Sequence, residues 1–236
     1  MKIIYDYSPN HSKETRHKKD IKFIIIHYTG MQSEIETLKW LKNPKSKVSC
    51  HYLINRSGSV VQMVKDKYVA WHAGKSRWKQ FNNLNNSSLG IELVNKGHEF
   101  GYQNFSRKQI FRLILLCKLL KKKYGIKKEN FLGHSDIAPL RKIDPGEKFP
   151  WKKLSGFNLG RWFKKNRKKF KFDVKKIESQ FFKNLKMLGY GYISLKQSNG
   201  KKKRKIIESF QRHYLPDNVT GKIDTKTLKI SYFLLK

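Results

Sequence analysis

The order of apolar and polar positions predicts alternating strands and helices through the first two-thirds of the chain. Apolar runs at 21–28 (IKFIIIHY) and 89–95 (LGIELVN) are typical of strands buried in a sheet. Residues 48–55 and 60–64 flank the turn sequence Arg-Ser-Gly-Ser at 56–59, which predicts a β-hairpin. The first strand carries a histidine, His27, near its carboxyl end.

Helices are predicted between these strands. Ser33 stands before an amphipathic segment that ends at Leu41, and Glu36 follows three residues later, a capping-box pattern. Residues 106–124 have helical periodicity, and Gly125 ends it. Residues 131–132 then begin a short strand or loop. The alternation of strands and helices predicts a mixed α/β domain over residues 21–162.

The two ends of this domain differ in character from its interior. Residues 1–20 are polar and charged, and we expect them to form a loose N-terminal arm. Residues 163–173 belong to a strongly basic stretch and are expected to be a connector. Neither segment has the apolar periodicity of a packed element.

A second pattern of helices occupies residues 174–236. An amphipathic segment at 174–188 ends at Gly189, and a second runs over 203–214. Asp224 is placed to cap a short third helix that begins at the next residue. The sequence therefore predicts a small, separate, all-α module of three helices.

Charge sets this chain apart from an average protein. It has 53 Lys and Arg against 17 Asp and Glu, a net charge of +36, while 38% of its 236 residues are hydrophobic. That apolar content excludes a wholly disordered chain. The charge favours an anionic partner such as nucleic acid, an acidic lipid surface or an anionic polymer, but a compositional drift toward lysine explains it equally well.

Cysteine content and the N-terminal region bear on location. Two cysteines, Cys50 and Cys117, are too few for a disulfide framework and fit a reducing compartment. No stretch approaches a membrane span, and no signal peptide or lipid-attachment cysteine is seen near Met1. We therefore expect a cytoplasmic protein, or a periplasmic or outer-membrane-associated one if the true start lies upstream.

Three residues form a candidate metal site. His27 ends a buried strand, His134 follows a glycine, and Asp144 precedes Pro145. Two histidines and one carboxylate make a tetrahedral zinc set with a fourth position for water, although Fe(II) and Mn(II) accept the same ligands. For any one histidine among the eight in the chain, a structural or solvated role is the commoner alternative.

Glu92 is an acid inside the apolar segment 89–95. Burial of an unpaired carboxylate raises its pKa and suits it to general acid/base catalysis. The alternative is that strand alternation turns Glu92 toward solvent.

Five motifs in a fixed order together resemble one enzyme family. They are HYTG at 27–30, VSCHYLI at 48–54, AWHAG at 70–74, LGIELVN at 89–95, and GHSDIAPLRKIDPG followed by EKFPW at 133–151. The chain resembles the zinc-dependent N-acetylmuramoyl-L-alanine amidases over residues 21–151. The resemblance implies a mixed central β-sheet flanked by helices, the phage-lysozyme-like amidase fold. It also implies hydrolysis of the amide between the lactyl group of N-acetylmuramic acid and L-alanine, in peptidoglycan or muropeptides, during cell-wall turnover or recycling.

The resemblance also implies roles for individual residues. His27, His134 and Asp144 match the family's ligands for one Zn²⁺ per chain. Glu92 matches its catalytic acid/base, which would take a proton as zinc-activated water attacks and return it to the leaving nitrogen. Lys142 matches the lysine that, with zinc, would stabilise the oxyanion formed during reaction.

Further residues in the family motifs are candidates for substrate binding. Trp71 could stack on a sugar, His72 could contact peptide or the zinc-bound region, and His51 could line the same groove. Packing roles for Trp71 and His51 are equally consistent with the sequence. Cys50 stands where a small residue is expected, and the three ligands already present argue against a metal role for it.

The C-terminal module resembles, more weakly, the three-helix peptidoglycan-binding domains attached to such amidases. Its run of basic residues at 201–205 could bind anionic glycan or nucleic acid, or could simply be solvated. Two other functions stay open: a catalytically inactive glycan-binding relative and a nucleic-acid-binding protein. The presence of all five site residues favours the amidase, and no nucleic-acid-binding signature appears. We expect a monomer with a muropeptide or peptidoglycan substrate and no specific nucleic-acid partner.

Overall fold

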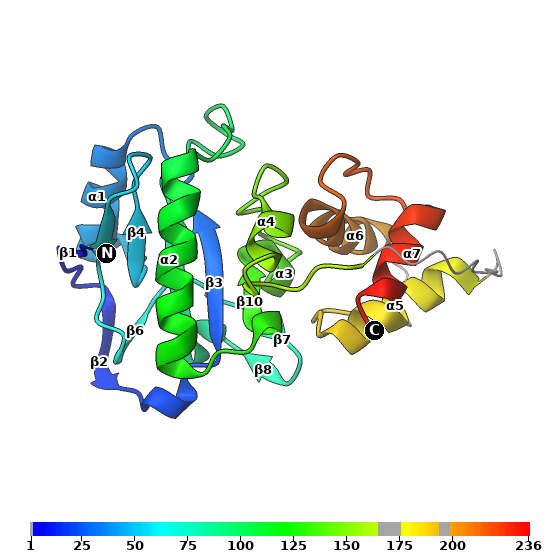
Figure 1. Ribbon diagram of the computed structural model, residues 1–236, viewed down its shortest axis with the longest axis horizontal. Coiled ribbons are helices and arrows are strands. Elements are labelled where there is room, and N and C mark those ends of the chain that lie inside the picture. Colours follow the sequence, from blue (N-terminus) through cyan, green and yellow to red (C-terminus); the bar gives the residue numbers. More distant parts are fainter. Residues whose placement is uncertain (1, 165–175, 194–198) are drawn as a thin grey trace.

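A computed structural model describes residues 2–164, 176–193 and 199–236 (Figure 1). Its centre is a six-stranded sheet in the order β1-β5-β4-β9-β3-β10. β4 and β5 form the predicted antiparallel hairpin, and the other neighbouring pairs are parallel. The sheet strands are β1 (Ile4–Tyr5), β3 (Phe23–Tyr28), β4 (Tyr52–Ile54), β5 (Val60–Gln62), β9 (Ser88–Leu93) and β10 (Phe131–Gly133).

Two small ribbons and seven α-helices complete the described elements. The ribbons pair β2 (His11–Thr15) with β6 (Tyr68–Ala70), and β7 (Arg77–Trp78) with β8 (Phe81–Asn82). The helices are α1 (Glu34–Lys42), α2 (Arg107–Tyr124), α3 (His134–Ile137), α4 (Trp151–Ser155), α5 (Ile177–Leu188), α6 (Gly200–Tyr214) and α7 (Thr225–Phe233). Short 3₁₀ turns lie at Lys18–Asp20, Pro44–Ser46, Leu84–Ser87 and Lys128–Asn130. The predicted fold class, a mixed sheet with helices and a helical C-terminal part, is confirmed.

Local capping signals account for where the helices begin and end. The side chains of Ser33 and Asp224 accept backbone N–H groups at the starts of α1 and α7, and Gly125 ends α2 with a positive φ. α6 begins three residues before the predicted position, because the Asn199 side chain accepts the N–H of Lys202.

Side-chain alternation assigns the two faces of the sheet. Ile24, Ile26 and Ile91 belong to the core that α2 covers (Figure 1). Because successive strand residues point to opposite faces, His27 and Glu92 lie on the face away from α2. They are also direct register partners on the adjacent parallel strands β3 and β9. Their side chains therefore emerge next to one another.

The prediction of a loose N-terminal arm is wrong. β1 extends the sheet along the edge of β5, and β2 pairs with β6. Buried polar side chains fix the segment between them: the Asn10 amide donates to Asn43 O and Val48 O, and the Ser8 hydroxyl donates to Leu41 O. Such a segment carries no apolar pattern, because backbone and amide hydrogen bonds rather than hydrophobic contacts hold it in place.

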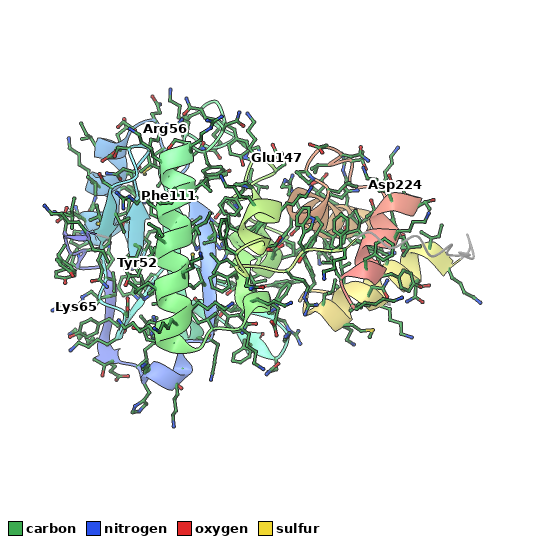
Figure 2. The ribbon with its side chains drawn as sticks, in the orientation of Figure 1. Tyr52, Arg56, Lys65, Phe111, Glu147 and Asp224 are labelled. Atoms are coloured by element: carbon green, nitrogen blue, oxygen red, sulfur yellow. The ribbon has the colours of Figure 1, made fainter. Side chains whose placement is uncertain are left out.

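The C-terminal helices share a core with the sheet domain. Phe181 of α5 and Phe210 of α6 belong to one buried cluster with Phe23, Ile25 and Trp78. Figure 2 shows Glu147 at the boundary between the two parts. The predicted connector lies almost entirely outside the described residues. Within the described part of the chain, no helix combines the length and apolar character needed to cross a membrane.

Candidate metal centre

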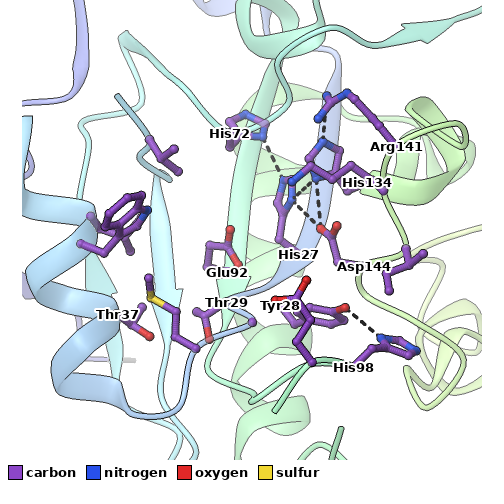
Figure 3. A pocket seen from close by; sticks show the side chains of 18 residues that line it. His27, Tyr28, Thr29, Thr37, His72, Glu92, His98, His134, Arg141 and Asp144 are labelled. Carbon is purple, nitrogen blue, oxygen red and sulfur yellow. Dashed lines mark hydrogen bonds and ion pairs between the residues drawn. The ribbon is translucent and has the colours of Figure 1, made fainter. Parts of the chain in front are cut away.

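Three parts of the chain bring the candidate ligands together. His27 is near the carboxyl end of β3, and β10 lies beside β3 in parallel, so His134, the residue after β10, emerges at the same sheet edge. The loop that follows α3 returns Asp144 to this point (Figure 3). Nδ1 of His27 lies 3.0 Å from Nδ1 of His134 and 3.0 Å from Oδ2 of Asp144, and the last two atoms are 3.1 Å apart.

Hydrogen bonds behind His27 determine its tautomer. The Ser88 hydroxyl donates to Leu84 O, so its oxygen accepts from Nε2–H of His72, 3.2 Å away. Nδ1 of His72 is then an acceptor, and Nε2–H of His27 donates to it over 3.0 Å. This leaves Nδ1 of His27 with a free lone pair that points into the site.

His134 is held in the same way. Its Nε2 lies 3.1 Å from Ala73 O, which can only accept, and 3.3 Å from Arg141 Nη2, which can only donate. The shorter contact, to Ala73 O, places the proton on Nε2 and the lone pair on Nδ1. Arg141 donates to the same carbonyl. Fixing a ligand histidine through its outer nitrogen is the usual arrangement behind a metal site.

These assignments define an acceptor cluster, namely Nδ1 of His27, Nδ1 of His134 and Oδ2 of Asp144. Three acceptor atoms 3.0–3.1 Å apart repel one another unless a cation lies among them. Ligands ~2.0–2.1 Å from a tetrahedral zinc ion lie ~3.3 Å from each other, close to the observed spacing. Among the described residues, this is the one group of His, Cys, Asp and Glu side chains arranged to hold a metal. The residues present therefore fit a zinc ion.

The pKa shifts of His27 and Asp144 are those expected of metal ligands. Burial, reinforced by the nearby His134, lowers the pKa of His27 to about 4, so its imidazole is neutral at pH 7. Burial alone would raise the pKa of Asp144, but the two histidines outweigh it and hold that pKa well below the usual range. The cluster thus offers a neutral imidazole from His27 and an ionised carboxylate from Asp144.

Glu92 stands beside the acceptor cluster (Figure 3). Burial, and secondarily the charge of Asp144, raises the pKa of Glu92 to about 8, while Lys142 acts in the opposite direction. Its Oε2 is buried and has no hydrogen-bond partner among the described residues. A carboxyl group with a pKa near neutrality and a free oxygen is suited to exchanging protons with a bound substrate.

A cavity of about 410 Å³ opens over these groups. Glu92, Lys142 and His72 line it together with the acceptor cluster. His72 was predicted to contact peptide or the zinc-bound region, and the structure places it as the hydrogen-bond partner of His27. Gly90 makes room for this ring, since a Cβ there would come within 2.4 Å of it.

Two of the predicted substrate residues do not line this cavity. The His51 ring is fully buried, where its Nδ1 accepts from Gly90 N and its Nε2 lies 2.8 Å from Arg16 Nη2. These contacts give His51 a packing role. Trp71 is half-buried and likewise lies outside the cavity lining.

Sequence reasoning missed several lining residues. Trp40, on α1, is 45% exposed and borders the cavity, as do Glu99 and His98. The amphipathic pattern of α1 placed Trp40 on a helix but gave no signal that this helix faces the metal centre. Asp136, two residues after His134, is buried and was assigned no role.

Comparison with known proteins supports the resemblance found in the sequence motifs. A family model described as N-acetylmuramoyl-L-alanine amidase matches residues 17–147. N-acetylmuramoyl-L-alanine amidase AmiD of Escherichia coli K12 is 34% identical over 234 residues, which cover 92% of this chain and 83% of AmiD. The 1,6-anhydro-N-acetylmuramyl-L-alanine amidase AmpD of Haemophilus influenzae is 33% identical to this chain. The aligned region covers 62% of this chain and 86% of AmpD.

A solved structure shows a similar fold over most of the chain. It is the complex of E. coli AmiD with the substrate anhydro-N-acetylmuramic acid-L-Ala-D-γ-Glu-L-Lys. It matches with a TM-score of 0.79 and 30% identity, over 95% of this chain and 91% of AmiD.

Proposed function

This chain belongs to the N-acetylmuramoyl-L-alanine amidase family, and from that premise we propose that it is a zinc enzyme acting on muropeptides. It hydrolyses the amide between the lactyl group of N-acetylmuramic acid and L-alanine in cell-wall recycling. The observation that carries the proposal is the acceptor cluster, with three converging lone pairs beside a carboxyl group of raised pKa. The substrate named in the AmiD complex supports the choice of muropeptide.

His27, His134 and Asp144 would hold the metal. When bound, zinc supplies a Lewis acid that brings the pKa of a coordinated water toward 7 and polarises a carbonyl oxygen. The hydrogen bonds from the outer nitrogens of His27 and His134 keep both rings oriented with the proton away from the site.

Glu92 moves the protons. In its ionised form it accepts a proton from the attacking water. Its raised pKa makes the carboxylate a stronger base for this step and lets the resulting acid hold the proton near neutral pH until it is donated. It then gives the proton to the nitrogen of L-alanine as the carbon–nitrogen bond breaks. The free, buried Oε2 is available for both transfers because no described residue occupies it.

Lys142 supplies positive charge from the cavity wall. The carbonyl oxygen of the scissile amide becomes negative only during attack, so an ammonium group nearby stabilises the transition state more than the bound substrate. Lys142 lies between His134 and Asp144 in sequence, so the same loop that carries these ligands positions it.

Hydrolysis of defined muramyl-peptides tests this function. N-acetylmuramoyl-L-Ala-D-γ-Glu-L-Lys and its 1,6-anhydro form are incubated with the full chain, after chelation and again after zinc is restored. Mass spectrometry is expected to show zinc-dependent release of the tripeptide with a free N-terminal L-alanine. Intact substrate in the presence of folded, zinc-loaded protein, or cleavage at another bond, contradicts the proposal.

A further inference from the structure

One face of helix α6 contacts the loop that carries the metal centre. Lys205, Ser209 and His213 are spaced four residues apart and therefore share a side of the helix. The Lys205 ammonium donates to Leu140 O over 2.8 Å, and the Ser209 hydroxyl donates to Ser135 O over 2.8 Å. Figure 1 shows α6 beside α3 and α4.

The third contact of this face reaches a buried carboxylate. Nδ1 of His213 lies 2.8 Å from Oδ2 of Asp136, and the Tyr190 hydroxyl, just after α5, donates to Oδ1 over 2.9 Å. The backbone N–H of Gly133 donates to the same carboxylate over 2.7 Å. The His213 ring stacks on the Trp151 ring with the ring centroids 4.0 Å apart, and this stacking fixes the plane of the imidazole.

These bonds flank His134 on both sides along the chain. Asp136 holds the N–H of Gly133, the residue before His134, and Ser209 holds the carbonyl of Ser135, the residue after it. Ser135 also donates its N–H to Asp144 O over 2.9 Å. Movement of this turn would therefore shift two members of the acceptor cluster together.

We infer that α6 and Tyr190 are a brace for the metal centre: they position the 134–144 loop so that His134 and Asp144 meet His27. The inference rests on the proposed function for the identity of the metal. Tyr190 and His213 are positioning residues that act through Asp136 and do not touch substrate. The C-terminal helices therefore serve the catalytic centre by positioning two of its metal ligands.

The physical basis is the buried carboxylate of Asp136. It is 1% exposed, so water cannot replace a donor that is removed. Loss of Tyr190 or His213 donation leaves the carboxylate to find new partners, and the turn that bears His134 moves with it. Interactions of this outer kind tune metal affinity, and their loss costs ~10–100-fold in binding or activity.

The test measures zinc affinity in the full chain by competition with a fluorescent chelator. Tyr190→Phe removes one donor, His213→Leu removes the other, and His213→Asn keeps an N–H in place of the imidazole Nδ1–H. Tyr190→Phe and His213→Leu are expected to bind zinc ~10–100-fold more weakly than the wild type. His213→Asn should recover most of the lost affinity.

A matched control separates bracing from general loss of stability. The Asn184 side chain donates to Ser231 Oγ over 2.9 Å, a hydrogen bond between α5 and α7. Asn184→Ala should lower the thermal midpoint of unfolding of the protein and leave zinc affinity unchanged. With saturating zinc, His213→Leu should show a reduced kcat with little change in KM, because the substrate contacts are intact.

The outcomes distinguish the two claims. Zinc affinity and kcat in Tyr190→Phe and His213→Leu equal to those of Asn184→Ala overturn the brace, even if the wild type is an active zinc amidase. A wild type that binds zinc but releases no peptide overturns the proposed function, while the zinc affinities of the variants still decide the brace.

Discussion

Two buried clusters of histidine and aspartate lie on either side of the short helix α3, and they differ in their hydrogen-bonding groups. One brings acceptors together, and the other surrounds an acceptor with donors. In the acceptor cluster, three lone-pair atoms face one another with no donor among the described residues between them. Around Asp136, the carboxylate receives N–H or O–H donors from Gly133, Tyr190 and His213. The acceptor cluster therefore needs a cation, whereas the hydrogen bonds to Asp136 satisfy its carboxylate without one.

The difference shows that residue type and burial alone do not identify a metal centre. His134 and Asp136 are both buried and stand two positions apart in the chain. What separates their functions is the direction in which each ring or carboxylate can donate or accept. Asp66 resembles Asp136 in this respect. Its buried carboxylate receives hydrogen bonds from Tyr52, Lys123 and Tyr124.

The largest effect is expected from Asp144→Asn, which removes the negative charge of the acceptor cluster. Zinc binding should weaken by more than the ~10–100-fold that outer contacts cost, and peptide release should fall to background. Chelator competition and the muramyl-peptide assay measure the two effects. Wild-type zinc affinity in this variant would contradict the conclusion that the acceptor cluster, unlike the surroundings of Asp136, needs a cation.

Glu92→Gln should reduce kcat by ~10²–10⁴-fold, the usual contribution of a general acid/base. The amide is nearly isosteric with the carboxyl group and Glu92 is not a ligand, so zinc binding should be retained. Single-turnover kinetics with zinc-saturated protein measure the loss. Near-wild-type turnover would remove Glu92 from proton transfer.

Lys142→Ala should lower kcat by ~10²–10³-fold, as expected for loss of one group that stabilises an oxyanion. KM should change little, because the charge it stabilises appears only during reaction. Lys142→Arg keeps the positive charge and serves as the matched control, with an intermediate rate. A change confined to KM would instead assign Lys142 to substrate binding.

Asp66→Asn should have the smallest effect on the enzyme: unchanged zinc affinity and kcat, with unfolding free energy lower by about 1–3 kcal/mol. Burial raises the pKa of Asp66, but its hydrogen-bond donors outweigh this and the net pKa is lowered. Its contribution is therefore complete above the unfolded pKa of ~3.9 and is lost as pH falls toward the folded pKa. Urea unfolding of wild type and variant should converge below pH ~4; a constant difference would argue against the ionised carboxylate.

The elements that sequence could predict are those with local signals. The apolar run of β3, the capped helix α2 and the Asp224 cap of α7 all follow from neighbouring residues. The N-terminal strands were missed because Asn10 and its neighbours form buried polar contacts without an apolar pattern.

For the site, the family motifs supplied the ligands and Glu92, which the fold brings together. Sequence could not reveal that His51 packs away from the cavity, nor that His213 meets Asp136, 77 positions earlier. Such contacts depend on how the C-terminal helices dock, and no local pattern encodes that. The four-residue spacing of Lys205, Ser209 and His213 was the one available signal.

A zinc titration of wild type, Asp144→Asn and Asp136→Asn shows whether the acceptor cluster is the metal centre, with folding of each protein checked by circular dichroism. We expect one zinc site in the wild type, none in Asp144→Asn, and one in Asp136→Asn with reduced affinity. A retained site in Asp144→Asn, or a wild type that binds no zinc, would contradict the assignment of the acceptor cluster as the metal centre.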